Sequence, residues 1–222
     1  MFIFIDLDDT ILDFKKAESV ALKRSLLEFG ISADDDTVTL YSVINDKMWK
    51  RLERGENTRE EILVMRFKEF FDCLNLKKDP EKMNEIYKKN LSVGHFFMPE
   101  AEEFLEKLQG HRLFIVSNGT TSVQNGRIKS AGIEKYFEKI FLSQDVGFDK
   151  PDKRFFDKCF KEIEGFNKDQ AIILGDSLTS DIQGGKNAGI KTCWYNPRKK
   201  QGEADHTITS LMEFFDVLRE YC

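Results

Sequence analysis

Five short apolar runs recur along the chain, and they constrain its fold more than any other feature. They span residues Phe2–Ile5, Leu113–Val116, Lys139–Leu142, Ala171–Leu174 and Lys191–Tyr195. Each run has the length of a buried strand, and its nearly continuous apolar character is typical of parallel strands covered on both faces. Segments with helical periodicity separate most of the runs. We therefore expect an α/β fold built on a doubly wound parallel sheet.

Helix start and stop signals lie between and after these runs. Gly132 follows a helical pattern over residues 121–131, where a glycine can end the helix in the left-handed conformation. Ser210 and Glu213 have the spacing of a capping box, which predicts a C-terminal helix. The first signal places a helix between two predicted strands, where a crossover connection is needed, and the second places one after the last strand.

Residues 14–91 break the alternation of strands and helices. Apolar residues recur there at helical spacing, no convincing strand is present, and Thr58 with Glu61 forms a further capping box. We expect four helices that form a small bundle. The predicted domains are a discontinuous core of residues 1–13 and 92–222 and an inserted helical domain of residues 14–91.

Composition excludes several classes of protein. The 222 residues allow one or two domains, and no apolar run is long enough to span a bilayer. A net charge of −5 argues against a nucleic-acid partner. The N-terminal apolar run stops at Asp6, too early for a signal peptide, so we expect a cytoplasmic protein. Its scattered cysteines are expected to be reduced: Cys73, Cys159, Cys193 and Cys222.

Three carboxylates directly follow the first apolar run, at Asp6, Asp8 and Asp9. Like charges this close repel one another unless a cation lies among them or one carboxyl keeps its proton. A divalent metal and a phosphate group would account for the cluster.

Polar residues also follow the other predicted strands. Ser117 and Asn118 follow the second, Lys150 the third, and Asp176 and Asp181 the fourth. Because parallel strands end at the same edge of a sheet, we expect these side chains to converge at a ligand site.

This set of side chains suits phosphoryl transfer. Asp6 and Asp176 with a backbone carbonyl could hold Mg²⁺, and Lys150 and Ser117 could neutralise phosphate oxygens. Asp6 is the candidate nucleophile, which would form an aspartyl-phosphate. Asp8, two residues on, could protonate the leaving oxygen and then deprotonate water.

Four motifs in this order resemble those of the haloacid dehalogenase superfamily, in its phosphatase branch. They are Asp6–Thr10, Val116–Asn118, Lys150-Pro151 and Gly175-Asp176 with Asp181. The helical insertion resembles the C1 cap of that superfamily, a lid over the active site. The resemblance covers essentially the whole chain and implies a small-molecule phosphate monoester as substrate.

The resemblance also implies a role for each motif residue. Asp6, Asp176 and the backbone carbonyl of Asp8 would hold Mg²⁺, and Asp181 would support the metal through water. Phosphate binding would fall to Ser117, Asn118 and Lys150.

A finer resemblance is to the bacterial pyrimidine 5′-nucleotidase subgroup, which acts on uridine, deoxyuridine and thymidine monophosphates. It is carried by Asn45–Trp49, Arg66-Phe67, Val123–Arg127 and Gly184–Pro197. Candidate substrate-selecting residues within it are Asn45, Trp49, Arg66, Gln124 and Arg127.

Two other functions remain open on the sequence. A sugar-phosphate phosphatase or phosphomutase would use the same core with a different lid. A phospho-aspartate signalling receiver also clusters carboxylates with a hydroxyl and a lysine, although the helical insertion and Asp8 argue against it. We expect a monomer or a weak homo-oligomer.

Overall fold

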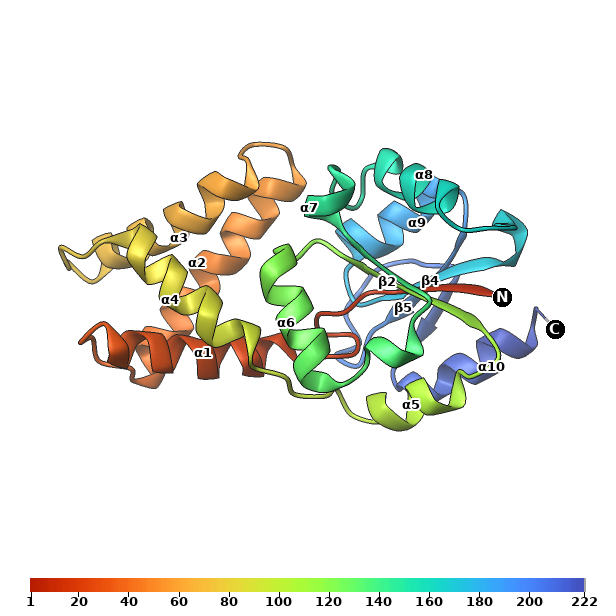
Figure 1. Ribbon diagram of the computed structural model, residues 1–222, viewed down its shortest axis with the longest axis horizontal. Coiled ribbons are helices and arrows are strands. Elements are labelled where there is room, and N and C mark those ends of the chain that lie inside the picture. Colours follow the sequence, from red (N-terminus) through yellow and green to blue (C-terminus); the bar gives the residue numbers. More distant parts are fainter. Residues whose placement is uncertain (222) are drawn as a thin grey trace.

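A single parallel sheet forms the centre of the molecule (Figure 1). The computed structural model describes residues 1–221. Its six strands lie in the order β3-β2-β1-β4-β5-β6. They are β1 (Phe2–Ile5), β2 (Arg112–Ser117), β3 (Lys139–Leu142), β4 (Ala171–Gly175), β5 (Lys191–Tyr195) and β6 (His206–Ile208). Five of them match the predicted apolar runs. The sequence did not predict β6, because this edge strand is only three residues long and includes His206 and Thr207.

The strand order reverses beside β1. From β1 the chain adds β2 and β3 on one side and then returns to add β4, β5 and β6 on the other. Ile5 pairs with Ile115 of β2 and with Leu174 of β4, so three strands end together at one edge. Open α/β sheets bind ligands at such a switch point, beyond the carboxyl ends of the strands.

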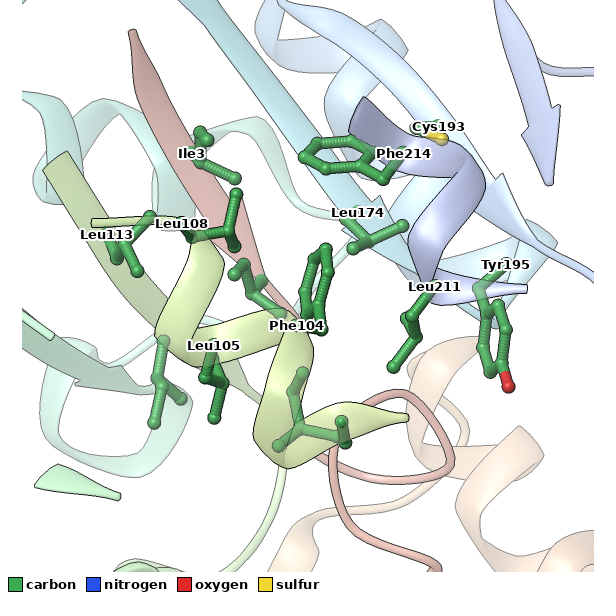
Figure 2. Packing of buried hydrophobic residues seen from close by; sticks show 14 of the residues in the cluster. Ile3, Phe104, Leu105, Leu108, Leu113, Leu174, Cys193, Tyr195, Leu211 and Phe214 are labelled. Atoms are coloured by element: carbon green, nitrogen blue, oxygen red, sulfur yellow. The ribbon is translucent and has the colours of Figure 1, made fainter. Parts of the chain in front are cut away.

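Helices cover both faces of the sheet, as the doubly wound prediction requires. Alternate residues of β1 point to opposite faces, so Ile3 and Ile5 lie in one apolar cluster, and Phe2 and Phe4 in the other. The first cluster includes residues of α5 (Ala101–Lys107), α6 (Thr121–Ala131) and α10 (Phe214–Arg219), and the second includes residues of α8 (Lys153–Lys161) and α9 (Gln183–Ala188). Figure 2 shows Phe104 of α5 with Leu174 and Phe214 of α10 in the first cluster.

Some helix ends follow their predicted signals and others do not. Gly132 ends α6 in the left-handed conformation, with φ 66°. At the C-terminal helix, however, Glu213 accepts from the backbone N–H of Thr209 instead of that of Ser210. The predicted capping box therefore does not form. Ser210 instead caps a short 3₁₀ turn, Leu211–Glu213, and α10 begins after it.

Four helices lie between β1 and α5, at the left of Figure 1: α1 (Phe14–Glu28), α2 (Asp35–Glu53), α3 (Arg59–Cys73) and α4 (Pro80–Ser92). We call them the cap. Thr58 and Glu61 form the predicted capping box of α3. Aromatic rings fill the centre of the cap, where Tyr41 lies 5.0 Å from Phe67 and 5.4 Å from Tyr87 between ring centroids. The division into two domains at the predicted boundaries stays a prediction.

The two connections between cap and core run side by side. Leu12 and Phe97 form an isolated antiparallel bridge, and the backbone N–H of Asp13 donates to the carbonyl of Phe96 at 2.8 Å. The chain thus enters and leaves the cap at neighbouring points.

Two further sequence expectations concern membranes and cysteines. No helix within residues 1–221 is both long and apolar enough to cross a membrane. Cys73, Cys159 and Cys193 are free thiols, and Cys222 lies outside the described residues.

Candidate active site

Asp6 and Lys150 form the centre of the site. Asp6 directly follows β1, and its backbone N–H donates to the carbonyl of Leu174 at the end of β4. Lys150 comes from the loop after the short helix α7 (Ser143–Val146) and is 1% exposed. Its ammonium donates to Asp6 Oδ1 at 2.7 Å, to the Val116 carbonyl at 2.7 Å and to Asp181 Oδ1 at 2.6 Å. All three N–H donors of Lys150 are therefore used within the protein.

Asp176 and Asp181 complete the acidic part of the site. Asp176 follows β4, and Asp181 lies in a π-helical turn, Leu178–Ile182, which the sequence did not predict. This turn brings Asp181 close to Gly175, where a Cβ atom would lie only 2.3 Å from Asp181 Oδ2. Carboxylate oxygens of Asp6, Asp176 and Asp181 all lie within 4.8 Å of one another.

Burial of this cluster shifts its ionisation. Burial, together with the charges of Asp181 and Asp9, raises the pKa of Asp176 to about 8. Burial and Asp181 also raise the pKa of Asp6, more than the nearby Lys150 lowers it. Although burial opposes its charge, Asp181 and Asp6 raise the pKa of Lys150. One ammonium thus does not balance the carboxylates around it.

The donor set fits a hard divalent cation such as Mg²⁺. Such ions take carboxylate oxygens, and a second positive charge would lower the cost of ionising Asp6 and Asp176 together. The close carboxylate group contains Asp181, whereas the sequence predicted Asp8 as a ligand through its backbone carbonyl and Asp181 as an outer support. Those individual assignments stay predictions.

Ser117 is the last residue of β2, and Asn118 directly follows it. Ser117 Oγ accepts from the Gly119 backbone N–H at 3.1 Å and from Gln124 Nε2 at 2.8 Å, which leaves its own O–H free to donate. The side chain of Asn118 instead forms two hydrogen bonds with the backbone of Lys150. Its Nδ2 donates to the Lys150 carbonyl, and its Oδ1 accepts from the Lys150 N–H, both at 2.8 Å. Asn118 therefore holds the loop that presents Lys150.

Asp8 is held by two residues of α6. Gln124 Nε2 donates to Asp8 Oδ2 at 2.6 Å, and Arg127 Nη1 donates to Asp8 Oδ1. Gln124 and Arg127 are 1% and 0% exposed. The sequence predicted them as substrate-selecting residues, and that role stays a prediction. The structure shows both side chains bound to Asp8, and Gln124, but not Arg127, lines the cavity described below.

Asp9 supports the loop between β1 and α1. It has φ 57°, and its Oδ1 accepts from the Phe14 backbone N–H at 2.9 Å, at the first turn of α1. Thr10 Oγ1 lies 3.5 Å from Asp6 Oδ2. This loop therefore orients Asp6 and anchors the first cap helix.

A cavity of about 220 Å³ lies between these residues and the cap. Its core side includes Asp6, Asp8, Ser117, Asn118, Lys150, Asp176 and Asp181. Its cap side includes three of the predicted selecting residues, Asn45, Trp49 and Arg66, together with an apolar wall formed by Phe14, Leu52, Leu63 and Leu91. The structure thus brings the predicted core residues and these three cap residues to one cavity.

Known proteins share the fold and much of the sequence of this chain. The family model for haloacid dehalogenase-like hydrolases matches residues 3–195. The chain belongs to this family. A crystal structure of the HAD hydrolase YfnB from Bacillus subtilis, bound to magnesium and reported to reveal interdomain movement, superposes with a TM-score of 0.93. It is 35% identical to this hydrolase, over 98% of this chain and 97% of that one.

Two named nucleotidases are also similar to this hydrolase over nearly their whole length. Pyrimidine 5′-nucleotidase PynA of Streptococcus pneumoniae is 34% identical, over 98% of this chain and 94% of its own. Pyrimidine 5′-nucleotidase YjjG of Escherichia coli is 28% identical, over 97% of this chain and 96% of its own.

The cap side of the cavity holds partners that the sequence did not predict. Arg66 Nη1 donates to Asn45 Oδ1 at 3.0 Å, and Nη2 donates to Asn84 Oδ1 at 2.8 Å. Asn45 Nδ2 donates in turn to Glu18 Oε1 at 2.7 Å, and burial raises the pKa of Glu18. These four side chains come from four different helices. The sequence predicts each helix but not which side chains of different helices contact one another.

Two polar contacts join the cap of this hydrolase to its core, and the sequence predicted neither of them. Arg59, the first residue of α3, pairs with Asp149 and donates to Ser143 Oγ at 2.7 Å. Thr179 Oγ1 donates to Glu53 Oε2, at the end of α2, at 2.9 Å. They join the cap to the loops that carry Lys150 and Asp181.

Proposed function

We propose that this hydrolase is a Mg²⁺-dependent phosphatase that acts on pyrimidine nucleoside 5′-monophosphates such as dUMP, UMP and dTMP through an aspartyl-phosphate on Asp6. One observation carries the proposal: Asp6, Asp8, Lys150 and Asp176 meet at the floor of a cavity whose other wall is the cap. The two similar nucleotidases support the substrate class.

The first half of the reaction uses Asp6 and Asp8. A carboxylate oxygen of Asp6 bonds to phosphorus while the phosphorus–oxygen bond to the nucleoside breaks. Asp8 gives its proton to the leaving oxygen, so the nucleoside departs as a neutral alcohol and Asp8 becomes a carboxylate. Lys150, bonded to Asp6 at 2.7 Å, fixes the nucleophile in the buried site.

The second half restores both residues. Asp8 takes a proton from water as the water oxygen bonds to phosphorus, and the bond from phosphorus to Asp6 breaks. Inorganic phosphate leaves, Asp6 is again a carboxylate, and Asp8 is again protonated.

Charge neutralisation at the floor needs more than Lys150. Asp6, Asp176 and the backbone carbonyl of Asp8, with Asp181 as a nearby support, would hold Mg²⁺, which would supply positive charge for the carboxylates and the phosphate together. The free O–H of Ser117 is placed to donate to a phosphate oxygen, whereas Lys150 would have to exchange one protein acceptor to do so.

The cap side of the cavity fits a nucleobase. Trp49 and the apolar wall offer a surface for a flat ring, and Asn45 and Arg66 add polar groups at one place. A hexose phosphate has hydroxyls on every side, and those that face this apolar wall would find no hydrogen-bond partner there.

Phosphate release from a substrate panel tests the proposal. We expect Mg²⁺-dependent turnover that EDTA abolishes, with kcat/KM on dUMP and dTMP at least about tenfold above that on hexose phosphates, or ~1.4 kcal/mol in transition-state binding. A preference for hexose phosphates would favour the sugar-phosphate alternative. A stable phosphoprotein without turnover would favour a receiver. A cytoplasmic location and a monomeric or weakly oligomeric state stay predictions.

A further inference from the structure

Helix α6 touches both Asp8 and the connection that returns from the cap to the core. Arg127 reaches in both directions: Nη1 donates to Asp8 Oδ1, while Nε donates to the carbonyl of Gly94 at 3.3 Å. Gly94 lies just after α4, in the segment of residues 92–97 that we call the return linker. One rigid guanidinium group thus joins the proposed acid to the segment that connects the cap to the core.

The return linker lies directly against α6. A Cβ atom on Gly126 would be 2.5 Å from the Ser92 carbonyl oxygen and 2.9 Å from Ser92 Cβ. Ser130 Oγ, one turn later on the helix, donates to the carbonyl of Val93 at 3.1 Å. Gly126 therefore permits a close approach that any other residue would prevent, and this approach sets the distance from Gly94 to Arg127.

Gln124 completes the hold on Asp8. Its Nε2 bridges Asp8 Oδ2 and Ser117 Oγ, and its Oε1 accepts from Arg127 Nη1 at 3.0 Å. A Cβ on Gly119 would lie 2.3 Å from Gln124 Nε2, so this glycine leaves the space that Gln124 occupies. Both oxygens of Asp8 are therefore fixed by α6, and Arg127 is fixed by Gln124 and the linker.

We propose that Arg127 is a positioning residue for Asp8, and that it makes the proton transfer depend on the seating of the return linker on α6. This inference rests on the proposed phosphatase function and deepens it. The step concerned is transfer of the Asp8 proton to the ester oxygen as the phosphorus–oxygen bond breaks. When the linker leaves α6, Arg127 loses Gly94, and the carboxyl of Asp8 loses the orientation that points its proton at the leaving oxygen.

Two leaving groups reveal this role. An alkyl phosphate such as dUMP needs its leaving oxygen protonated, whereas p-nitrophenyl phosphate releases a stable phenolate that does not. For Arg127→Met in saturating Mg²⁺, we expect kcat/KM on the alkyl phosphate to fall by about 10²-fold, and kcat/KM on p-nitrophenyl phosphate to fall by less than about threefold. The quantity compared is kcat/KM because it covers only the steps through formation of the aspartyl-phosphate, whereas kcat also includes its hydrolysis, in which Asp8 acts as the base for both substrates alike.

Two further variants separate positioning from a general loss of structure. Lys129→Met removes an exposed cation from the same helix and should leave kcat/KM on both substrates unchanged. Gly126→Ala keeps Arg127 but pushes the return linker away from α6, and it should lower kcat/KM on the alkyl phosphate more than on p-nitrophenyl phosphate. Gly126→Ala also tests the proposal if Arg127→Met does not fold. Thermal unfolding with and without Mg²⁺ checks that each variant is folded and binds metal.

The outcomes distinguish this inference from the proposed function. If the wild type hydrolyses neither substrate, the phosphatase proposal fails. If the wild type hydrolyses both and folded Arg127→Met loses kcat/KM equally on both, or keeps it on both, the positioning role is overturned. A folded Gly126→Ala with an unchanged ratio of the two kcat/KM values would overturn the dependence on the linker.

Discussion

The two sides of the cavity are built in opposite ways. On the core side, charged groups converge from the ends of neighbouring strands, and Lys150 binds Asp6 and Asp181 across the chain. On the cap side, Arg66 and Asn45 are bound to other cap residues, and much of the remaining wall is apolar. The core side is therefore equipped for chemistry on a phosphate, and the cap side for contact with the rest of a substrate.

The two sides also differ in what they contribute to stability. The core side buries several carboxylates with one lysine, and the raised pKa of Asp176 shows that their ionisation opposes folding. The cap has an aromatic centre in which Tyr41, Phe67 and Tyr87 pack together. The buried carboxylates of the core side thus lower the free energy of unfolding where a cation and a phosphate would bind, and aromatic packing in the cap raises it.

The largest expected effect comes from the nucleophile. Asp6→Asn removes the attacking carboxylate, so we expect turnover of every substrate to fall by at least about 10³-fold, whatever its leaving group. The measurement is steady-state phosphate release from dUMP, a hexose phosphate and p-nitrophenyl phosphate. Asp9→Asn is the matched control, because asparagine tolerates the left-handed conformation and can still accept from Phe14. Selective loss on one substrate would contradict a shared nucleophile.

The second prediction concerns the metal side of the core. Asp176 has a pKa of about 8 in the folded chain, and ~3.9 is expected when it is unfolded. Between these values the folded state binds more protons, so in EDTA the free energy of unfolding should decrease as pH rises from 5 to about 9. Asp176→Asn should flatten this decrease and raise stability at high pH by a few kcal/mol, at roughly 1.4 kcal/mol per pKa unit.

Mg²⁺ provides the complementary measurement on the same pair of proteins. It should raise the unfolding temperature of the wild type, most strongly at high pH, and should barely change that of Asp176→Asn. Equal stabilisation of both proteins by Mg²⁺ would place the ion elsewhere.

The same contrast explains how far the sequence could predict the structure. Asp6, Ser117 and Asp176 were predictable because each follows a nearly continuous apolar strand, and the parallel sheet brings strand ends together. In contrast, β6 was missed because its residues His206–Ile208 carry no apolar run.

Contacts that depend on side-chain direction could not be predicted. Gln124 and Arg127 were assigned to substrate selection from a resemblance alone. Their reach to Asp8 depends on the absence of a Cβ on Gly119 and on the way α6 packs against the return linker. These contacts between side chains of different elements arise from tertiary packing, which helical periodicity does not predict.

The cap side should respond more weakly and more selectively. Arg66→Met removes the hydrogen bonds to Asn45 and Asn84 and leaves their oxygens buried, so we expect a loss of about 2–4 kcal/mol in the free energy of unfolding. The preference for dUMP over a hexose phosphate should change by about tenfold, while kcat on p-nitrophenyl phosphate stays close to that of the wild type. Lys68→Met, exposed on the same helix, is the matched control. Parallel losses on all three substrates would mean that the cap acts on the chemistry itself.

The smallest expected effect lies where the two sides meet. Arg59 is 7% exposed and pairs with Asp149, which joins α3 to the loop before Lys150. Arg59→Met should loosen the closed cap and raise KM about threefold with little change in kcat, because the pair contributes to closure and not to bond breaking. A double-mutant cycle with Asp149→Asn should show that the two changes are not additive, since each removes the same contact. Additive effects on KM would show that Arg59 acts through Ser143 instead, and a matching fall in kcat would show that closure also orders the loop of Lys150.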